Sequence, residues 1–110
     1  MTEPHLTQEQ QKSLWLHRAV LGALMTDPDS VLATAQRNVE RFKLVHRSDG
    51  MSVRYLEQWQ SAISEGIDSV VKVLTGTDER SSELRQNSPF AGVLSDEQRM
   101  QVLRSFRDSP

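Results

Sequence analysis

The feature that most constrains the fold is the segment 84–94, whose sequence is LRQNSPFAGVL. This segment is apolar and cannot continue as a helix beyond Asn87 and Ser88, although the patterns on either side of it are helical. Pro89 lacks an amide hydrogen and has a fixed φ, and Gly92 permits backbone conformations that other residues avoid. The sequence therefore predicts a rigid apolar connection between two helices, which serves either as a plug in the core or as a recognition surface.

Capping signals divide the rest of the chain into helices. The pairs Thr7/Gln10 and Ser95/Gln98 have the form of capping boxes, and the Asp-Pro pair at 27–28 combines a favoured N-cap with a favoured first helical residue. Apolar residues recur with helical spacing after each signal. We expect helices over about 8–25, 28–45, 52–64, 67–74, 78–86 and 96–107.

The expected fold is all-α, a compact bundle of five or six short helices in one domain, with residues 1–6 disordered and 108–110 frayed. The first helix is apolar beyond one face, since Trp15 and Ala19 lie outside its main apolar arc. This helix is therefore central or meets a partner. Four further expectations concern burial: Val45, Ile67 and Met100 face the core, and the fifth helix touches the core through Leu84 and little else.

Composition excludes several kinds of function. The 110 residues carry a net charge of −2, contain no Cys and have only three widely spaced His. We expect no metal, no cofactor and no catalytic constellation, so the chain is predicted not to be an enzyme.

The acidic start and the lack of a long apolar window predict a cytoplasmic protein without a membrane segment. Carboxylates at 27–29 and 96–97 argue against reading of a DNA groove by this chain alone.

Three stretches also carry a family resemblance: the run 85–95, Leu-Trp-Leu-His-Arg at 14–18 and Tyr-Leu-Glu-Gln-Trp at 55–59. Together they resemble a family of small bacterial all-helical proteins whose genes tend to lie beside genes for toxins. The resemblance covers nearly the whole chain. It implies an antitoxin or toxin-associated role and no catalytic residues.

The leading hypothesis is a non-enzymatic protein-binding module, an antitoxin that neutralises a protein partner by steric occlusion. Aromatic and arginine side chains are typical anchors of such interfaces. The chain could also pair with a second copy of itself. The candidate partner-binding residues lie on the first helix and in the segment 84–94: Trp15, His17, Arg18, Arg85, Gln86 and Phe90.

Two of these residues have a competing structural interpretation. Phe90, with Val93, can plug the core. His17 can be a core residue bonded to a carbonyl oxygen. A catalytic role for His17 would need a polar pocket, and no Ser, Asp or Glu stands at a spacing that would suggest a triad.

Two further hypotheses concern other parts of the chain. A small transcriptional regulator could contact nucleic acid through a basic helix face formed by Arg37, Arg41, Lys43 and Arg47. A solvated helix face explains those residues equally. The sequence at 61–66, SAISEG, fits the loose pattern of the inhibitory helix in antitoxins of Fic-type AMP-transferases, and it also fits a helix end with a glycine cap.

Overall fold

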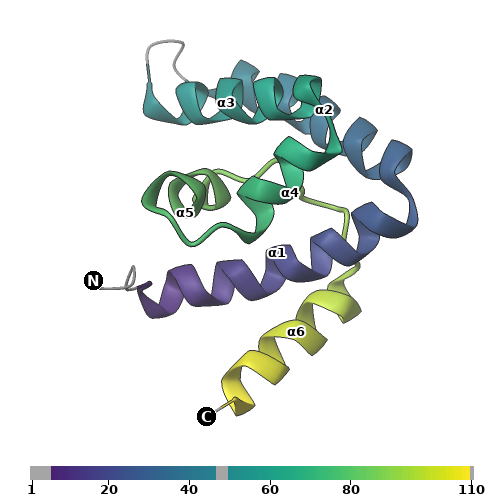
Figure 1. The fold of residues 1–110 in the computed structure, drawn as a ribbon, viewed down its shortest axis with the longest axis vertical. Helices are drawn as coiled ribbons and strands as arrows, with labels where there is room; N and C mark the ends of the chain where they lie inside the picture. Colours follow the sequence, from purple (N-terminus) through teal and green to yellow (C-terminus); the bar gives the residue numbers. More distant parts are fainter. Residues whose placement is uncertain (1–5, 47–49, 110) are drawn as a thin grey trace.

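A computed structural model describes residues 6–46 and 50–109; Arg47 and the ends expected to be disordered or frayed, 1–5 and 110, lie outside the described residues. The described part is all-α, with six helices and no strand (Figure 1). Its helices are α1 (Gln8–Thr26), α2 (Pro28–Val45), α3 (Met51–Glu65), α4 (Ile67–Thr75), α5 (Glu79–Gln86) and α6 (Asp96–Asp108).

The helix boundaries follow the capping signals. Both expected capping boxes form, and in the first the Thr7 hydroxyl accepts from the Gln10 amide while the Gln10 side chain accepts from the Thr7 amide. Asp27 caps α2 by accepting from the amide of Ser30. At the end of α6, Ser109 donates from its amide and from its hydroxyl to the Phe106 carbonyl oxygen. The expected fraying of residues 108–110 stays a prediction.

The helices are arranged around α1. Helices α2 and α3 form an antiparallel pair, α4 and α5 lie between that pair and α1, and α6 lies on the far side of α1 (Figure 1). The prediction of a central first helix is confirmed, because α1 packs against α2, α4 and α5 on one side and against α6 on the other. Its unusually wide apolar arc is thus used within the chain.

Trp59 occupies the centre of the core. Its side chain is fully buried, its Nε1 donates to the Leu84 carbonyl oxygen at 2.7 Å, and the Phe90 ring meets it edge-on at 5.2 Å. The segment 84–94 is thereby tied to α3 by both a hydrogen bond and an aromatic contact. The remaining core residues include Val20, Leu24, Val31, Ala35, Val39, Leu56, Val70 and Leu74.

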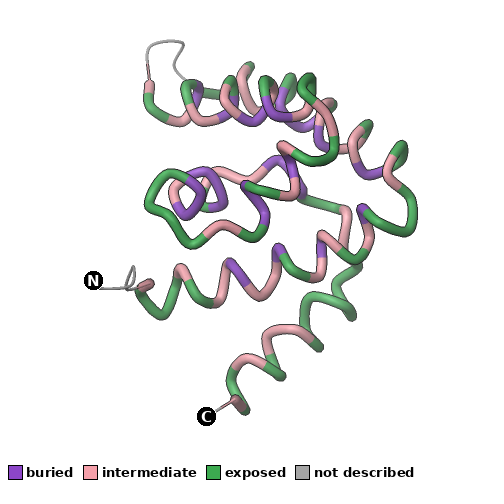
Figure 2. The backbone as a smooth tube through the Cα atoms, in the orientation of Figure 1, coloured by how far each residue is buried: buried purple, intermediate pink, exposed green. Residues whose placement is uncertain are grey.

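Three expected core residues are instead exposed: Val45 at 76%, Met100 at 57% and Ile67 at 37%. Val45 is the last residue of α2 and Ile67 is the first residue of α4. At such helix ends the apolar pattern of the sequence continues, but no neighbouring helix covers the side chain. Met100 is exposed because α6 packs chiefly on α1 and has no buried residue in the described structure (Figure 2).

We expected the fifth helix to touch the core through Leu84 and little else, and this prediction was also wrong. Helix α5 buries Ser81, Ser82 and Arg85 as well as Leu84. The reason is its position, since α5 contacts α1, α3 and α4. Its small hydroxyl side chains allow these neighbours to approach closely, and they give no apolar period that sequence reasoning could detect.

Candidate functional site

The segment 84–94 is held by one buried side chain of α2. Asn38 is 6% exposed, and its Nδ2 donates to the carbonyl oxygens of Pro89 at 2.8 Å and Ala91 at 2.9 Å. Beyond this clamp the chain turns through Gly92, whose φ of 87° is disfavoured for other residues. The turn closes with a bond from the Val93 amide to the Phe90 carbonyl oxygen. The predicted non-helical connection between two helices is confirmed.

His17 links α1 to the same segment. Its Nδ1 lies 2.7 Å from the Ser13 carbonyl oxygen and its Nε2 lies 2.8 Å from the Ser88 hydroxyl. A carbonyl oxygen only accepts, so Nδ1 carries the proton and Nε2 accepts from Ser88. The Ser88 oxygen in turn accepts from the Phe90 amide. The structural interpretation of His17 as a buried residue bonded to a carbonyl oxygen is confirmed.

The structure brings a hydroxyl to His17 that sequence spacing did not suggest. A cavity of about 190 Å³ adjoins the pair and is lined by Leu16, Val20 and Arg99 among others. However, the pKa of His17 is lowered to about 4, chiefly by burial; the hydrogen bond to the Ser13 carbonyl oxygen opposes this shift, and the nearby Arg85 adds to it. The Nδ1 partner is a carbonyl oxygen rather than the carboxylate that stabilises an imidazolium during catalysis. The arrangement suits a structural hydrogen-bond relay.

Arg85 and Phe90 do not project as a recognition surface, because both are buried, at 2% and 5% exposure. Of the two alternatives for the segment 84–94, the recognition surface formed by Arg85 and Phe90 is therefore wrong, and Phe90 as a core plug is confirmed. Arg85 donates from Nη1 to the Val73 carbonyl oxygen at 2.8 Å and from Nη2 to the Ser82 hydroxyl at 3.3 Å. Burial lowers the pKa of Arg85, while Asp78 acts in the opposite direction.

The other candidate partner-binding residues lie on separate surfaces. Trp15 is half-buried because the Phe106 ring of α6 meets it edge-on at 5.4 Å. Exposed Arg18 shares a shallow hollow with Trp15, whereas exposed Gln86 borders another hollow beside Phe42. The six predicted residues therefore form no single contiguous site.

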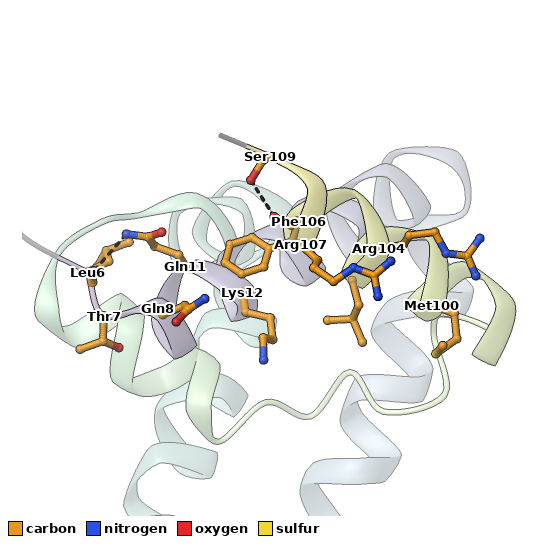
Figure 3. Close-up of a pocket in the computed structure, with 11 residues that line it drawn as sticks. Leu6, Thr7, Gln8, Gln11, Lys12, Met100, Arg104, Phe106, Arg107 and Ser109 are labelled. Carbon is orange, nitrogen blue, oxygen red and sulfur yellow. Dashed lines mark hydrogen bonds between the residues drawn. The ribbon is translucent and has the colours of Figure 1, made fainter.

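A groove with a volume of about 870 Å³ lies instead between the start of α1 and α6 (Figure 3). Figure 3 shows Met100, Arg104, Phe106 and Arg107 extending from α6, with Lys12 among the side chains of α1. The groove thus combines apolar with basic side chains, and no Asp or Glu lines it among the described residues. Lys12 pairs with Glu9 at 3.4 Å and Arg107 with Asp108 at 3.5 Å outside the lining. The apolar lining of the groove comprises Leu6, Met100, Leu103 and Phe106.

The basic residues of α2 come together only in part. Arg37 and Arg41 line one hollow with Ala91 and Gly92, whereas Lys43 is two positions beyond Arg41 and so about 200° round the helix. Arg47, the fourth predicted residue, lies outside the described residues. Among the described residues, the expected basic face therefore comes together only as the pair of Arg37 and Arg41.

The pattern at 61–66 forms a helix end. Gly66 ends α3 with a φ of 123° and donates its amide to the Ala62 carbonyl oxygen. Exposed Glu65 accepts from the Ser69 hydroxyl at 2.8 Å. The glycine cap is confirmed, and an inhibitory role for Glu65 stays a prediction.

Sequence reasoning missed Asn38, Ser88 and the groove residues of α6. A signal existed for Asn38, because an amide stands inside the apolar stripe that runs through Ala35 and Val39. Met100 and Arg104 gave no signal, since their helix has an ordinary amphipathic pattern whose partner face is defined only by where α6 docks.

Comparisons with known proteins leave the chain without an assigned relative. No family model, no curated protein and no solved structure matches it. In the described part, every helix is too short or too polar to cross a bilayer.

Proposed function

We propose that this chain is a non-enzymatic protein-binding module, an antitoxin that occludes the active site of its partner, and that the partner occupies the groove between α1 and α6. The observation that carries the proposal is the composition of that groove. The groove is large, four of its lining side chains are apolar, and its charged side chains, Lys12, Arg104 and Arg107, are all basic.

The chemistry of the groove specifies the occupant. Met and Arg are enriched where proteins bind one another, and an amphipathic helix typically places apolar anchors in such a groove. The basic rim complements acidic side chains beside those anchors. The expected occupant is an acidic amphipathic segment of the partner protein.

The test is co-expression with the product of the neighbouring gene, followed by co-purification and growth measurement. We expect the two proteins to co-purify and growth to recover. Met100→Asp and Arg104→Glu should each weaken the complex by about tenfold or more, because both alter the groove while leaving the core intact. Leu44→Asp is the matched control, since Leu44 is 85% exposed and does not line the groove.

Two results would count against the proposal. Absence of both co-purification and growth recovery would refute the antitoxin role. A complex that survives both groove substitutions unchanged would refute the assignment of the groove as its interface.

A further inference from the structure

The turn at Ala91 and Gly92 forms a second feature of interest, on a surface separate from the groove between α1 and α6. Arg37 and Arg41, one helical turn apart on α2, border this turn in a hollow of about 580 Å³. The hollow's other lining residues are Thr34 and Asn38, so no carboxylate lines it among the described residues. Two neighbouring guanidinium groups therefore face one concave surface without a balancing charge in its wall.

Both arginines are positioned by hydrogen bonds. Arg41 donates from Nη2 to the Asn38 Oδ1 at 2.9 Å, and Arg37 donates from Nη2 to the Thr34 hydroxyl at 3.3 Å. Asn38 is buried and holds the segment 84–94 through its Nδ2, so the same side chain fixes both the turn and Arg41. Each guanidinium retains further N–H donors, because it has five in total.

The backbone of the turn adds to this arrangement. Ala91 and Gly92 are exposed, and no hydrogen bond from either amide is found within the described residues. Gly92 has open space where a side chain would begin, so a ligand can approach the backbone closely. Arg99 borders the adjoining cavity, which shares Ala91 and Gly92, and contributes a third positive charge near the turn.

We propose that this hollow binds the phosphate group of a small phosphoester. Planar guanidinium forks match the oxygen geometry of phosphate and bind it with charge-assisted hydrogen bonds. Nucleic acid is the less suitable ligand, because its affinity depends on several phosphate contacts along a basic surface. Among the described residues of α2, Lys43 lies on another side of the helix from this pair of arginines, and the whole chain carries a net charge of −2.

The test is titration of the full chain with phenyl phosphate and, separately, with inorganic phosphate, followed by amide resonances in NMR. We expect saturable shifts centred on Ala91 and Gly92. Arg37→Gln and Arg41→Gln should each raise the Kd by about tenfold, the loss of one charge-assisted contact. Arg54→Gln on α3 is the matched control, and its Kd should equal that of the unmodified chain. If inorganic phosphate shifted the resonances and phenyl phosphate did not, the ligand would be free phosphate rather than a phosphoester, and the proposal would be overturned.

Three other results would also overturn it. One is the absence of shifts at the turn. Another is equal shifts with acetate at matched ionic strength, which would indicate an adventitious ion only. The third is tight binding of a single-stranded RNA that collapses steeply with salt, which would identify a nucleic-acid surface instead.

Discussion

The His17 imidazole and the Ser88 hydroxyl lie 2.8 Å apart although 71 positions separate them in the sequence. This bond joins α1 to the segment 84–94, and Nε2 accepts it because the neutral ring carries its proton on Nδ1. A proton on Nε2 would reverse the direction of this bond and place a charge on a buried ring. The second ring nitrogen already donates its proton to Ser13. The packing of α1 against the segment is therefore coupled to the protonation state of one buried imidazole.

Stability should consequently fall in mild acid. The pKa of His17 is about 4 in the folded chain because burial disfavours the charged ring, against an ordinary value of 6.5. Between these pH values the unfolded chain binds a proton that the folded chain does not. The free energy of unfolding should therefore decrease by about 3 kcal/mol as the pH falls from 6.5 to 4, and urea unfolding across that window measures it.

The control for this prediction is His17→Gln, which removes the titrating group and keeps a polar side chain. It should lower stability at pH 7 but show a shallower loss between pH 6.5 and 4. Parallel pH profiles for the two proteins would mean that carboxylates, and not His17, cause the acid sensitivity.

A second prediction concerns Trp59, the fully buried ring at the centre of the core. Trp59→Phe removes the donor to the Leu84 carbonyl oxygen and leaves a cavity beside Phe90. We expect the free energy of unfolding to drop by about 3 kcal/mol, chiefly from the lost packing, with a smaller contribution from the lost hydrogen bond because the Leu84 carbonyl oxygen still accepts from the Asn87 amide. Chemical denaturation at pH 7 measures the change.

Trp15→Phe provides the comparison. Trp15 is half-buried under α6 and keeps most of its contact with Phe106 after the change, so we expect a loss of about 1 kcal/mol or less. Equal losses for the two variants would contradict the assignment of Trp59 as the centre of the core.

The helix boundaries and the all-α class could be predicted because they depend on local signals. Capping boxes act over three residues, and an Asp-Pro pair or a glycine cap acts over fewer. The exposure of Met100 and the burial of Arg85 could not be predicted in the same way. Both depend on which helices meet, and the residues that decide this lie far apart in the chain.

The candidate sites show the same division. His17 and Phe90 could be recognised as core residues from their apolar surroundings in the sequence. The partners of His17 and Asn38 could not, because Ser88 and the Pro89 and Ala91 carbonyl oxygens approach them only after the segment 84–94 has folded back. Every residue has a carbonyl oxygen, so the residue type does not indicate which carbonyl oxygens accept a side-chain hydrogen bond.

A third prediction compares two glycines. Gly66 adopts a φ of 123° with a ψ of −179°, a conformation almost confined to glycine, so Gly66→Ala should destabilise the chain by about 1–3 kcal/mol. Gly22 lies on the exposed side of α1, and a Cβ there would meet nothing within 4 Å. Gly22→Ala should therefore stabilise the chain by about 0.5–1 kcal/mol. Thermal unfolding of both variants checks the opposite signs, and a shift of the same sign in both would contradict the described backbone.

The last prediction concerns α6, which packs chiefly on α1 and contributes no buried residue. Its amides should exchange with solvent faster than those of α3 and α4, because helices with little buried apolar surface open locally at low free-energy cost. Removal of residues 96–110 should leave a cooperatively folding chain and cost about 1–2 kcal/mol, chiefly by uncovering Trp15. Leu84→Ala, a substitution at a fully buried position, is the comparison, and it should lower the free energy of unfolding by about 2–5 kcal/mol. If the truncated chain lost its cooperative unfolding, α6 would be part of the core and the groove beside it a fixed feature of the fold.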